Sequence, residues 1–417
     1  MDKRTIRDVD VRDKRVLIRV DFNVPIKNGA VVDDTRIRAA LPTIQHALAG
    51  GAKAVVLLSH LGRPSGKMDP AFTLKPAADH LAQLIEAPVA FAPECVGPEV
   101  ETRLNALPSG GVLVLENVRF HPEEEGKVKL PDDADDAKRQ QAKADMKRRQ
   151  EAFAKALAAW GDIYVNDAFG TAHRAHASTA LITRFCDTNV AGFLMEKEIG
   201  FMGQALAHPE RPFVAIIGGA KITGKIDVIT NLLSKVDALL IGGGMAYTFY
   251  AAKALPVGKS LVEKDKIDLA RNIMENAEAA GVKLYLPVDH VIADDFSAEA
   301  QTEIVGEEGI KEGWMALDIG PETIEVYASE IAAAKTVIWN GPMGCFEMAP
   351  FARGTMAVAQ AVADTDCVSI IGGGDSVSAV NASGLADRMT HISTGGGASL
   401  EFLEGKELPG VAALDDC

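Results

Sequence analysis

The stretch RVLIRVDFN, residues 15–23, shows the pattern on which the whole chain is built. It begins as a run of apolar, mainly β-branched residues and ends on the polar residues Asp21 and Asn23. The pattern recurs in AKAVVLLSH (52–60), VLVLENVRF (112–120) and DIYVNDAFG (162–170). The second half repeats it in FVAIIGG (213–219), ALLIGGG (238–244), KTVIWNGP (335–342) and VSIIGGG (368–374). Each run is typical of a strand that is buried on both faces of a parallel sheet.

Helical patterns lie between these strands, for example the apolar stripe Ile37, Leu41, Ile44 and Leu48. Strands that alternate with helices predict an α/β fold whose parallel sheets are covered on both faces. At 417 residues and 44.2 kDa the chain exceeds the size at which one hydrophobic core stops growing. We therefore expect two doubly wound, Rossmann-like domains, with ligands bound at the carboxyl ends of the strands.

The boundary between the domains is predicted near residues 186–212. NVAGFLMEKEIGFMGQALA (189–207) predicts one helix, which the two prolines of HPERP end before the next strand. This helix would join a first domain, 1–187, to a second, 188–403. The charge-dense stretch 123–151 is interpreted as a solvated insertion that runs into a surface helix, with a binding arm as the alternative.

Composition limits the function. A net charge of -15 argues against a general nucleic-acid surface or an affinity for anionic membranes, so an acidic ligand needs a local cluster of cations. The five cysteines are widely spaced without a C-x-x-C pair, which indicates a reducing, cytoplasmic compartment and no structural metal site. The first residues do not resemble a secretory signal, and no apolar run approaches the ~20 residues that span a bilayer.

The first half concentrates cations at and after its strand ends. GTAHRAHAS (170–178) places His173, Arg174 and His176 among small residues, and its H-x-x-H spacing lacks the features of a zinc-protease helix. Further cations follow the other strands, namely Arg19, Arg36, His60, Arg63 and Arg119. Guanidinium groups pair with phosphate and carboxylate oxygens, so the set predicts a phospho-anion site. The alternative that the two histidines only satisfy loop backbone stays open.

The second half offers glycine-rich turns for phosphate. GAKITGK (219–225) matches G-x-x-x-x-G-K, but Ile226 replaces the hydroxyl residue that holds Mg²⁺ in a P-loop, which disfavours a P-loop NTPase. A strand-to-helix turn with Lys221 and Lys225 still suits a triphosphate. IGGGDS (371–376) and STGGGAS (393–399) allow close backbone approach to phosphate, and Asp375 is a candidate Mg²⁺ ligand.

One family combines these motifs in this order: DFNVP, SHLGRP, ENVRF, NDAFGTAHRAHAS, GGAKITGK, WNGPMGCFE, GGGDS and STGGGASLEF. The set spans nearly the whole chain and resembles the phosphoglycerate kinase family. The resemblance implies glycolytic and gluconeogenic phosphoryl transfer between 1,3-bisphosphoglycerate and ADP, giving 3-phosphoglycerate and ATP, with a carboxyl group as acceptor. It also implies that Mg²⁺ accompanies the nucleotide, that the enzyme is a cytoplasmic monomer, and that the tail 404–417 packs on the first domain.

The resemblance also assigns residues. It implies a phosphoglycerate site in the first domain made by Asp21, Asn23, Arg36, His60, Arg63, Arg119, His173, Arg174 and His176. It implies a nucleotide site in the second domain made by Lys225, Asn340, Pro342, Glu347, Gly373, Gly374, Asp375, Ser376, Gly395 and Gly396, with Asp375 on the metal. The groups implied at the moving phosphoryl are Arg36, Lys221, Gly374 and Gly397. Cys345 and Ala316 depart from the family's usual valine and glycine in the adenine pocket.

Two other classes compete with this interpretation. A dinucleotide-dependent oxidoreductase needs G-x-G-x-x-G after its first strand, and RVDFNVP offers no such turn. A non-catalytic phosphate-binding protein would keep the cations of the first half, but it has no need of Lys221, Lys225, Asp375 and Glu347 together.

Overall fold

The computed structural model describes residues 3–128, 130 and 135–417, so residues 129 and 131–134 of the charge-dense stretch lie outside the description. The chain divides into two compact units. The first comprises Met1–Gly200 and Glu407–Cys417, and the second comprises Phe201–Lys406. The helix α6 (Phe193–Ala207) contributes residues to both units.

The first unit is built on a six-stranded parallel sheet of order β5-β6-β4-β1-β7-β8. Its strands are β1 (Arg15–Arg19), β4 (Ala54–Leu58), β5 (Val89–Phe91), β6 (Gly111–Val114), β7 (Ile163–Asn166) and β8 (Asn189–Ala191). A two-stranded hairpin, β2 (Ile26–Lys27) and β3 (Ala30–Val31), follows β1. The central strand β1 pairs Val16 with Val55 on one side and with Ile163 on the other.

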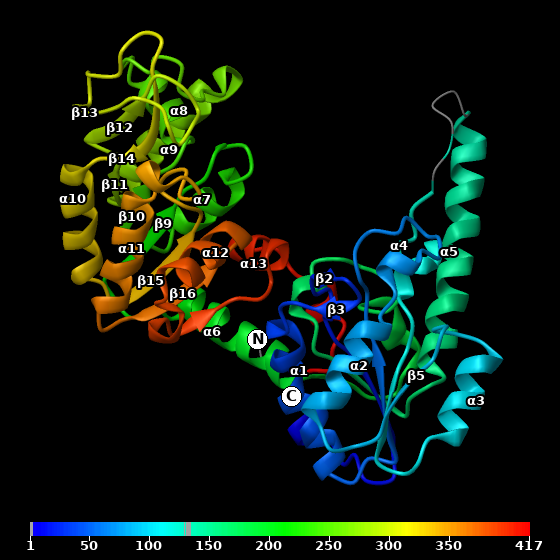
Figure 1. The fold of residues 1–417 in the computed structure, drawn as a ribbon. Helices are drawn as coiled ribbons and strands as arrows, with labels where there is room; N and C mark the ends of the chain where they lie inside the picture. Colours follow the sequence, from blue (N-terminus) through cyan, green and yellow to red (C-terminus); the bar gives the residue numbers. More distant parts are fainter. Residues whose placement is uncertain (1–2, 129, 131–134) are drawn as a thin grey trace. The chain divides into compact units, whose positions relative to one another are not determined.

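Helices cover this sheet (Figure 1). The longer helices of this unit are α1 (Thr35–Ala49), α2 (Lys75–Leu84), α3 (Pro98–Ala106) and α5 (Asp136–Ala158), and the single turn α4 (Pro122–Glu125) packs against α5. Ile37 and Ile44 of α1 and Leu81 of α2 share one apolar cluster with Val16 and Val55 of the sheet. In an α/β unit such clusters supply most of the stabilising burial, because the sheet buries its apolar side chains against the helices.

The two ends of the chain meet in the first unit. Lys3 donates from Nζ to the carbonyl oxygen of Leu414 at 2.7 Å, and Asn166 at the end of β7 donates from Nδ2 to the carbonyl oxygen of Gly410 at 3.0 Å. The last helix, α14 (Pro409–Ala412), therefore lies against the carboxyl end of the sheet.

The second unit has a second six-stranded parallel sheet, of order β11-β10-β9-β15-β16-β17. Its strands are β9 (Phe213–Ile217), β10 (Ala238–Ile241), β11 (Lys283–Tyr285), β15 (Thr336–Asn340), β16 (Val368–Gly372) and β17 (His391–Ile392). Its helices are α7 (Ile226–Leu233), α8 (Ala246–Ala252), α9 (Ile267–Ala280), α10 (Pro321–Ala332), α11 (Arg353–Asp364), α12 (Gly374–Ser383) and α13 (Gly397–Leu403). A small antiparallel sheet, β12 (Asp289–Ala293), β13 (Thr302–Gly306) and β14 (Met315–Ile319), adds to it.

The predicted fold class is confirmed, and each of the eight predicted strands is present. The predicted helix over 189–207 is wrong in its first residues, because Asn189–Ala191 forms the edge strand β8 beside β7. Gly192 separates strand from helix, and a Cβ there would collide with the carboxylate of Asp167. That carboxylate accepts backbone hydrogen bonds from Leu194 at 2.9 Å and Met195 at 3.2 Å, which fixes where α6 begins. Among the described residues, no helix is both long and apolar enough to cross a membrane.

Candidate active site

The carboxyl ends of β1 and β4 bring several predicted residues of the first half together. Arg36, in the first turn of α1, donates from Nη1 to Oδ2 of Asp21 at 2.9 Å and to the carbonyl oxygen of Asn23 at 3.4 Å. The side chain of Asn23 accepts a hydrogen bond from the backbone N–H of Gly62 at 2.9 Å, which ties the loop after β4 to the loop after β1. Asp21, Asn23 and Arg36 of the predicted set therefore form a connected network at this edge of the sheet.

A fully buried cation supports this network from the end of β1. Arg19 donates from Nε to Oγ of Ser178 at 2.8 Å, and its Nη2 lies 3.2 Å from Nδ1 of His60. The buried carboxylate of Glu124 accepts hydrogen bonds from Oγ of Ser178 at 2.6 Å and from its backbone N–H at 2.9 Å. Ser178 thus links the buried guanidinium of Arg19 to the buried carboxyl group of Glu124. These contacts fix Arg19 beside His60.

The loops after β4, β6 and β7 line a basic cavity of about 540 Å³. Its lining residues are Arg63, Ser65, Gly66, Arg119, His121, Pro122, Glu125, Lys127, Met146, Arg149 and Arg174. Three of these, Arg63, Arg119 and Arg174, were predicted from the sequence. Lys127 and Arg149 come from the charge-dense stretch, which was interpreted as a solvated insertion in preference to a binding arm, so part of that stretch contributes to the cavity.

Arg119 is the most constrained cation of the basic cavity. It is buried, and it donates from Nη1 to the carbonyl oxygen of Gly62 at 2.8 Å. Burial, and then the nearby charge of Arg19, lower its pKa to about 10. Its Nε is buried without a hydrogen-bond partner among the described residues, and the carboxylate of Glu125 lies 3.6 Å away. A buried N–H donor without an acceptor costs free energy of folding. An oxygen of a bound ligand that accepts its hydrogen bond would remove this cost.

The two histidines of GTAHRAHAS have lowered pKa values. Burial, followed by the positive charge of the neighbouring arginines, lowers the pKa of His173 to about 4 and that of His176 to about 3. Nε2 of His173 accepts a hydrogen bond from Nε of Arg174 at 3.0 Å, so this histidine orients the guanidinium. In the described part of the chain, neither histidine belongs to a group of three or more metal-ligating side chains.

The second unit has a cavity of about 440 Å³ at the carboxyl ends of β9, β10 and β15. Glycines form its floor, namely Gly219, Gly243, Gly244 and Gly344. Its other lining residues are Ala220, Tyr247, Lys259, Ser260, Leu261, Phe296, Met315, Ala316, Leu317, Pro342, Met343, Cys345, Glu347 and Asp375. Apolar walls with a few polar groups at one edge are typical of a small-molecule site. Pro342, Glu347 and Asp375 were predicted, and both unusual residues, Ala316 and Cys345, lie in the wall.

The turn that begins α12 presents backbone N–H groups beside this cavity. Gly373 has a φ of +90° and caps the helix, and a Cβ on it would lie 3.1 Å from the side chain of Asn340. Ser376 accepts a hydrogen bond on Oγ from the backbone of Gly341 at 2.5 Å. Lys225 donates to Oδ1 of Asn340, and burial lowers the pKa of this lysine. The N-terminus of α12 and Lys225, which is held from the loop before α7, both favour phosphate.

Other predicted residues lie outside the lining of that cavity. Lys221 is exposed on the loop between β9 and α7, and the glycines Gly395, Gly396 and Gly397 form the turn into α13. Gly396 has a φ of +49°, a conformation that favours glycine.

A buried trio of side chains beside the glycine-floored cavity was not predicted from the sequence. Tyr247 lines the cavity, and its hydroxyl lies 3.1 Å from Nδ1 of His290. Nε2 of His290 lies 2.8 Å from the hydroxyl of Tyr250, which itself donates to the carbonyl oxygen of Pro287. The hydroxyl proton of Tyr250 is thus used, so Nε2 of His290 donates and Nδ1 accepts from Tyr247. No local pattern connects residues 43 positions apart in the sequence.

A basic cavity in one parallel-sheet unit and a glycine-floored cavity in the other are suited to two phosphate-bearing ligands, as in an α/β phosphotransferase. The phosphoglycerate kinase family model matches residues 6–406. Curated relatives named phosphoglycerate kinase include those of Chloroherpeton thalassium, 55% identical, and Herpetosiphon aurantiacus, 56% identical, each with 100% of both chains covered.

Solved structures agree. A phosphoglycerate kinase from Coxiella burnetii has a TM-score of 0.85 at 39% identity and covers 99% of this chain and 98% of its own. One from Pyrococcus horikoshii has a TM-score of 0.77 at 32% identity, with 98% of each chain covered. The chain belongs to the phosphoglycerate kinase family, and the predicted kinase function is confirmed.

Proposed function

We propose that the first unit binds 3-phosphoglycerate or 1,3-bisphosphoglycerate in its basic cavity and that the second unit binds ADP or ATP in its glycine-floored cavity. The reaction is reversible transfer of a phosphoryl group between the acyl phosphate and the nucleotide. The observation that carries the proposal is Nε of Arg119, a buried donor without a hydrogen-bond partner among the described residues, beside a cavity that also presents Arg63 and Arg174.

On the phosphoglycerate side, Arg63, Arg119 and Arg174 are assigned to the phosphate of the substrate, because guanidinium groups pair bidentately with its oxygens. Arg36, held by Asp21 and Asn23, is assigned to the carboxyl end, where the phosphoryl group is gained or lost. Neutral His60, His173 and His176 supply hydrogen-bond donors or orient the arginines without adding charge.

On the nucleotide side, the apolar wall of the cavity is assigned to the base and Glu347 to the ribose hydroxyls. Lys225, Asn340, Pro342 and the turn Gly373 to Ser376 are assigned to the phosphates, together with Gly395 and Gly396. The exposed carboxylate of Asp375, at the start of α12, offers the oxygen ligand that Mg²⁺ prefers while phosphates and waters complete the shell. A bound Mg²⁺ would neutralise part of the phosphate charge.

Catalysis follows from positioning and charge. Phosphoryl transfer passes through a loose, anionic transition state, so the protein holds the attacking and leaving oxygens in line and needs no covalent intermediate. We assign Arg36, Lys221 and the backbone of Gly374 and Gly397 to stabilise the negative charge that develops in the transition state. Both ligands must meet for transfer, and we propose α6 as the hinge because its residues belong to both units. A monomeric state and a cytoplasmic location remain predictions from the resemblance.

The test is a coupled assay of ATP formation from 1,3-bisphosphoglycerate and ADP in the presence of Mg²⁺. We expect turnover that depends on both substrates and falls sharply in Arg119→Ala. Binding of both ligands without any ATP formation would instead favour the non-catalytic alternative and contradict the proposal.

A further inference from the structure

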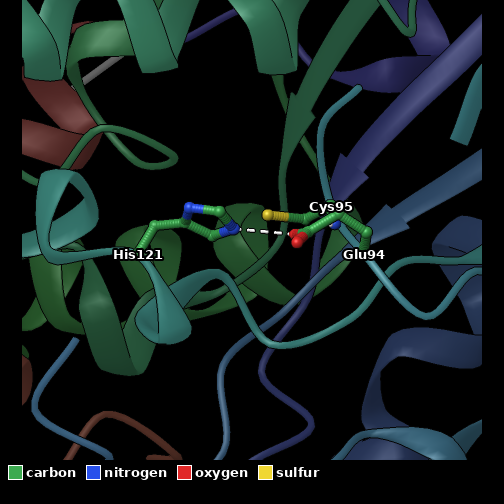
Figure 2. A group of neighbouring side chains, drawn as sticks. All are labelled: Glu94, Cys95 and His121. Atoms are coloured by element: carbon green, nitrogen blue, oxygen red, sulfur yellow. Dashed lines mark hydrogen bonds and ion pairs between the residues drawn. The ribbon is translucent and has the colours of Figure 1, made fainter. Parts of the chain in front are cut away.

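Three metal-ligating side chains of different chemistry meet in the first unit. Glu94 and Cys95 lie in the loop between β5 and α3, and His121 lies directly before α4. One carboxylate oxygen, the thiol sulfur and one imidazole nitrogen lie within 4.8 Å of one another (Figure 2). Among the described residues this is the one group of three or more His, Cys, Asp and Glu side chains that comes so close.

The backbone around the three side chains is firmly held. The carbonyl oxygen of Cys95 accepts a hydrogen bond from Nε1 of Trp160 at 3.0 Å, and the backbone N–H of Cys95 donates to Oε1 of Glu94 at 2.8 Å. The imidazole of His121 stacks on Phe153 at 4.9 Å between ring centroids. Figure 2 shows the sulfur of Cys95 and the carboxylate of Glu94 on the same side of the imidazole. The three donors therefore converge from a fixed scaffold.

An ion can reach this group from solvent. The side chains of His121 and Glu94 are 26% and 35% exposed, whereas Cys95 is completely buried. His121 also lines the basic cavity described above. The sulfur thus forms the inner end of the site, and the carboxylate and imidazole form its open side.

We propose that Glu94, Cys95 and His121 bind a borderline-soft divalent transition-metal ion, with Zn²⁺ as the best match. One sulfur, one imidazole nitrogen and one carboxylate oxygen are all ligands of Zn²⁺ in proteins, and the fourth position is left for water. Mg²⁺ prefers oxygen ligands and does not suit this set, which separates the site from Asp375. The cysteine spacing predicted no structural metal site, and the site proposed here departs from that prediction, because it uses a single cysteine that no sequence motif connects to His121.

Binding requires a rearrangement that brings the three ligand atoms around one ion, and the loss of protons. Nε2 of His121 now lies 2.7 Å from Oε1 of Glu94, joined by a hydrogen bond. Tetrahedral Zn²⁺ places its nitrogen and oxygen ligands ~3.3 Å apart, so this hydrogen bond opens by roughly half an ångström. The thiol of Cys95 releases its proton to solvent as the sulfur–metal bond forms. The proton on Nε2 moves to Nδ1 when the ring is neutral, or to solvent when it is charged.

The ion would fasten the loop that follows β5 to the segment that follows β6. That segment carries Arg119, two residues before His121, so the site stiffens one wall of the basic cavity. A ligand that binds only the folded state raises its stability. Zn²⁺ is therefore expected to raise the thermal midpoint of the intact chain.

The test uses the full chain after treatment with a chelator, titrated with Zn²⁺ against a chromophoric competitor and separately with Co²⁺. We expect one equivalent of Zn²⁺ and a near-ultraviolet sulfur-to-cobalt charge-transfer band. Cys95→Ser should abolish the band, and Cys95→Ser and His121→Gln should each weaken Zn²⁺ binding by about tenfold or more. Cys367→Ser, a half-buried cysteine of the second unit, is the matched control and should change neither.

Two outcomes overturn the proposal: no cobalt–thiolate band in the wild-type chain, or Zn²⁺ affinity unchanged in Cys95→Ser. Glu94→Gln keeps the size and shape of the side chain, so it tests the site even if one of the other variants fails to fold. This variant should also weaken Zn²⁺ binding. Kinase activity of the chelator-treated enzyme with Mg²⁺-ADP is measured separately, so failure of the metal site leaves the proposed function untouched.

Discussion

Nη2 of the buried Arg19 lies 3.2 Å from Nδ1 of His60. A guanidinium can only donate, so Nδ1 of His60 accepts and the ring carries its proton on Nε2. Burial, and then the charges of Arg19 and Arg119, hold the pKa of His60 well below its usual range. The network thus provides a neutral donor next to several fixed positive charges.

The first prediction concerns this tautomer. In the intact chain with labelled histidine, long-range nitrogen–proton NMR spectra should show His60 as the Nε2–H form, with no titration near the ordinary histidine value of about 6.5. His60→Gln identifies the signal. A His60 resonance that titrates near the ordinary histidine value would contradict the assigned hydrogen bond.

The second prediction is that Arg174 serves the phosphoglycerate anion. Arg174→Ala should weaken 3-phosphoglycerate binding by about 1.5 to 3 kcal/mol, the range for a charge-assisted hydrogen bond, and leave ADP affinity nearly unchanged. Arg184→Ala is the control, because Arg184 is exposed and pairs with Glu151 at 3.8 Å. Calorimetry measures the affinity of each variant for 3-phosphoglycerate and for ADP. Stoichiometric zinc that is lost in His173→Ala would show that GTAHRAHAS serves a metal instead.

The third prediction separates two lysines of one loop. Lys221 is assigned to charge that develops only in the transition state, so Lys221→Ala should lower kcat by about 100-fold or more with much smaller changes in KM. Lys225 is held by Asn340, and Lys225→Ala should weaken nucleotide binding as well as rate. Lys253→Ala, on an exposed ion pair with Glu307, is the control for steady-state kinetics. Near-normal kcat in Lys221→Ala would remove it from the catalytic set.

The fourth prediction concerns pH and the buried trio Tyr247, His290 and Tyr250 beside the glycine-floored cavity. Burial lowers the pKa of His290 from 6.5 to about 4, and protonation of Nδ1 would break its bond from Tyr247. The unfolded chain therefore takes up a proton at a higher pH than the folded chain, so stability falls as the pH decreases from 6.5 towards 4. His290→Gln removes this titration and should flatten the dependence.

Denaturant unfolding at several pH values between 7 and about 5 measures this effect, with the slope as the readout rather than stability at one pH. The matched control is His208→Gln, since His208 is exposed at the end of α6. An equal slope in wild type and His290→Gln would show that the histidine contributes nothing to acid sensitivity.

The sequence predicted the strands that are buried on both faces, because there the apolar run itself carries the signal. Short edge strands carried no such signal in the sequence. β17 has only two residues, and Asn189–Ala191 (β8) continued the helical pattern of the residues that follow. The antiparallel β13 is mostly exposed and has no continuous apolar run. Edge strands depend on their neighbours for pairing, which local sequence does not report.

The residues of the site likewise divide into those that the sequence predicted and those that it did not. Arg36, His60, Arg119 and Asp375 could be predicted because they follow strands or begin helices at the carboxyl edge of a sheet. Arg149 reaches the basic cavity from the long helix α5, and Tyr247 meets His290 across two elements. Such contacts depend on tertiary packing between distant segments, so no spacing rule could have indicated them.

The central claim is that the two substrates occupy separate units, and calorimetry on the intact chain tests it most directly. Wild type, Arg119→Ala and Lys225→Ala are each titrated with 3-phosphoglycerate and with ADP. We predict that Arg119→Ala weakens 3-phosphoglycerate binding by about tenfold or more and spares ADP, whereas Lys225→Ala does the reverse. Loss of ADP binding in Arg119→Ala, or of 3-phosphoglycerate binding in Lys225→Ala, with the fold intact by circular dichroism, would contradict the account.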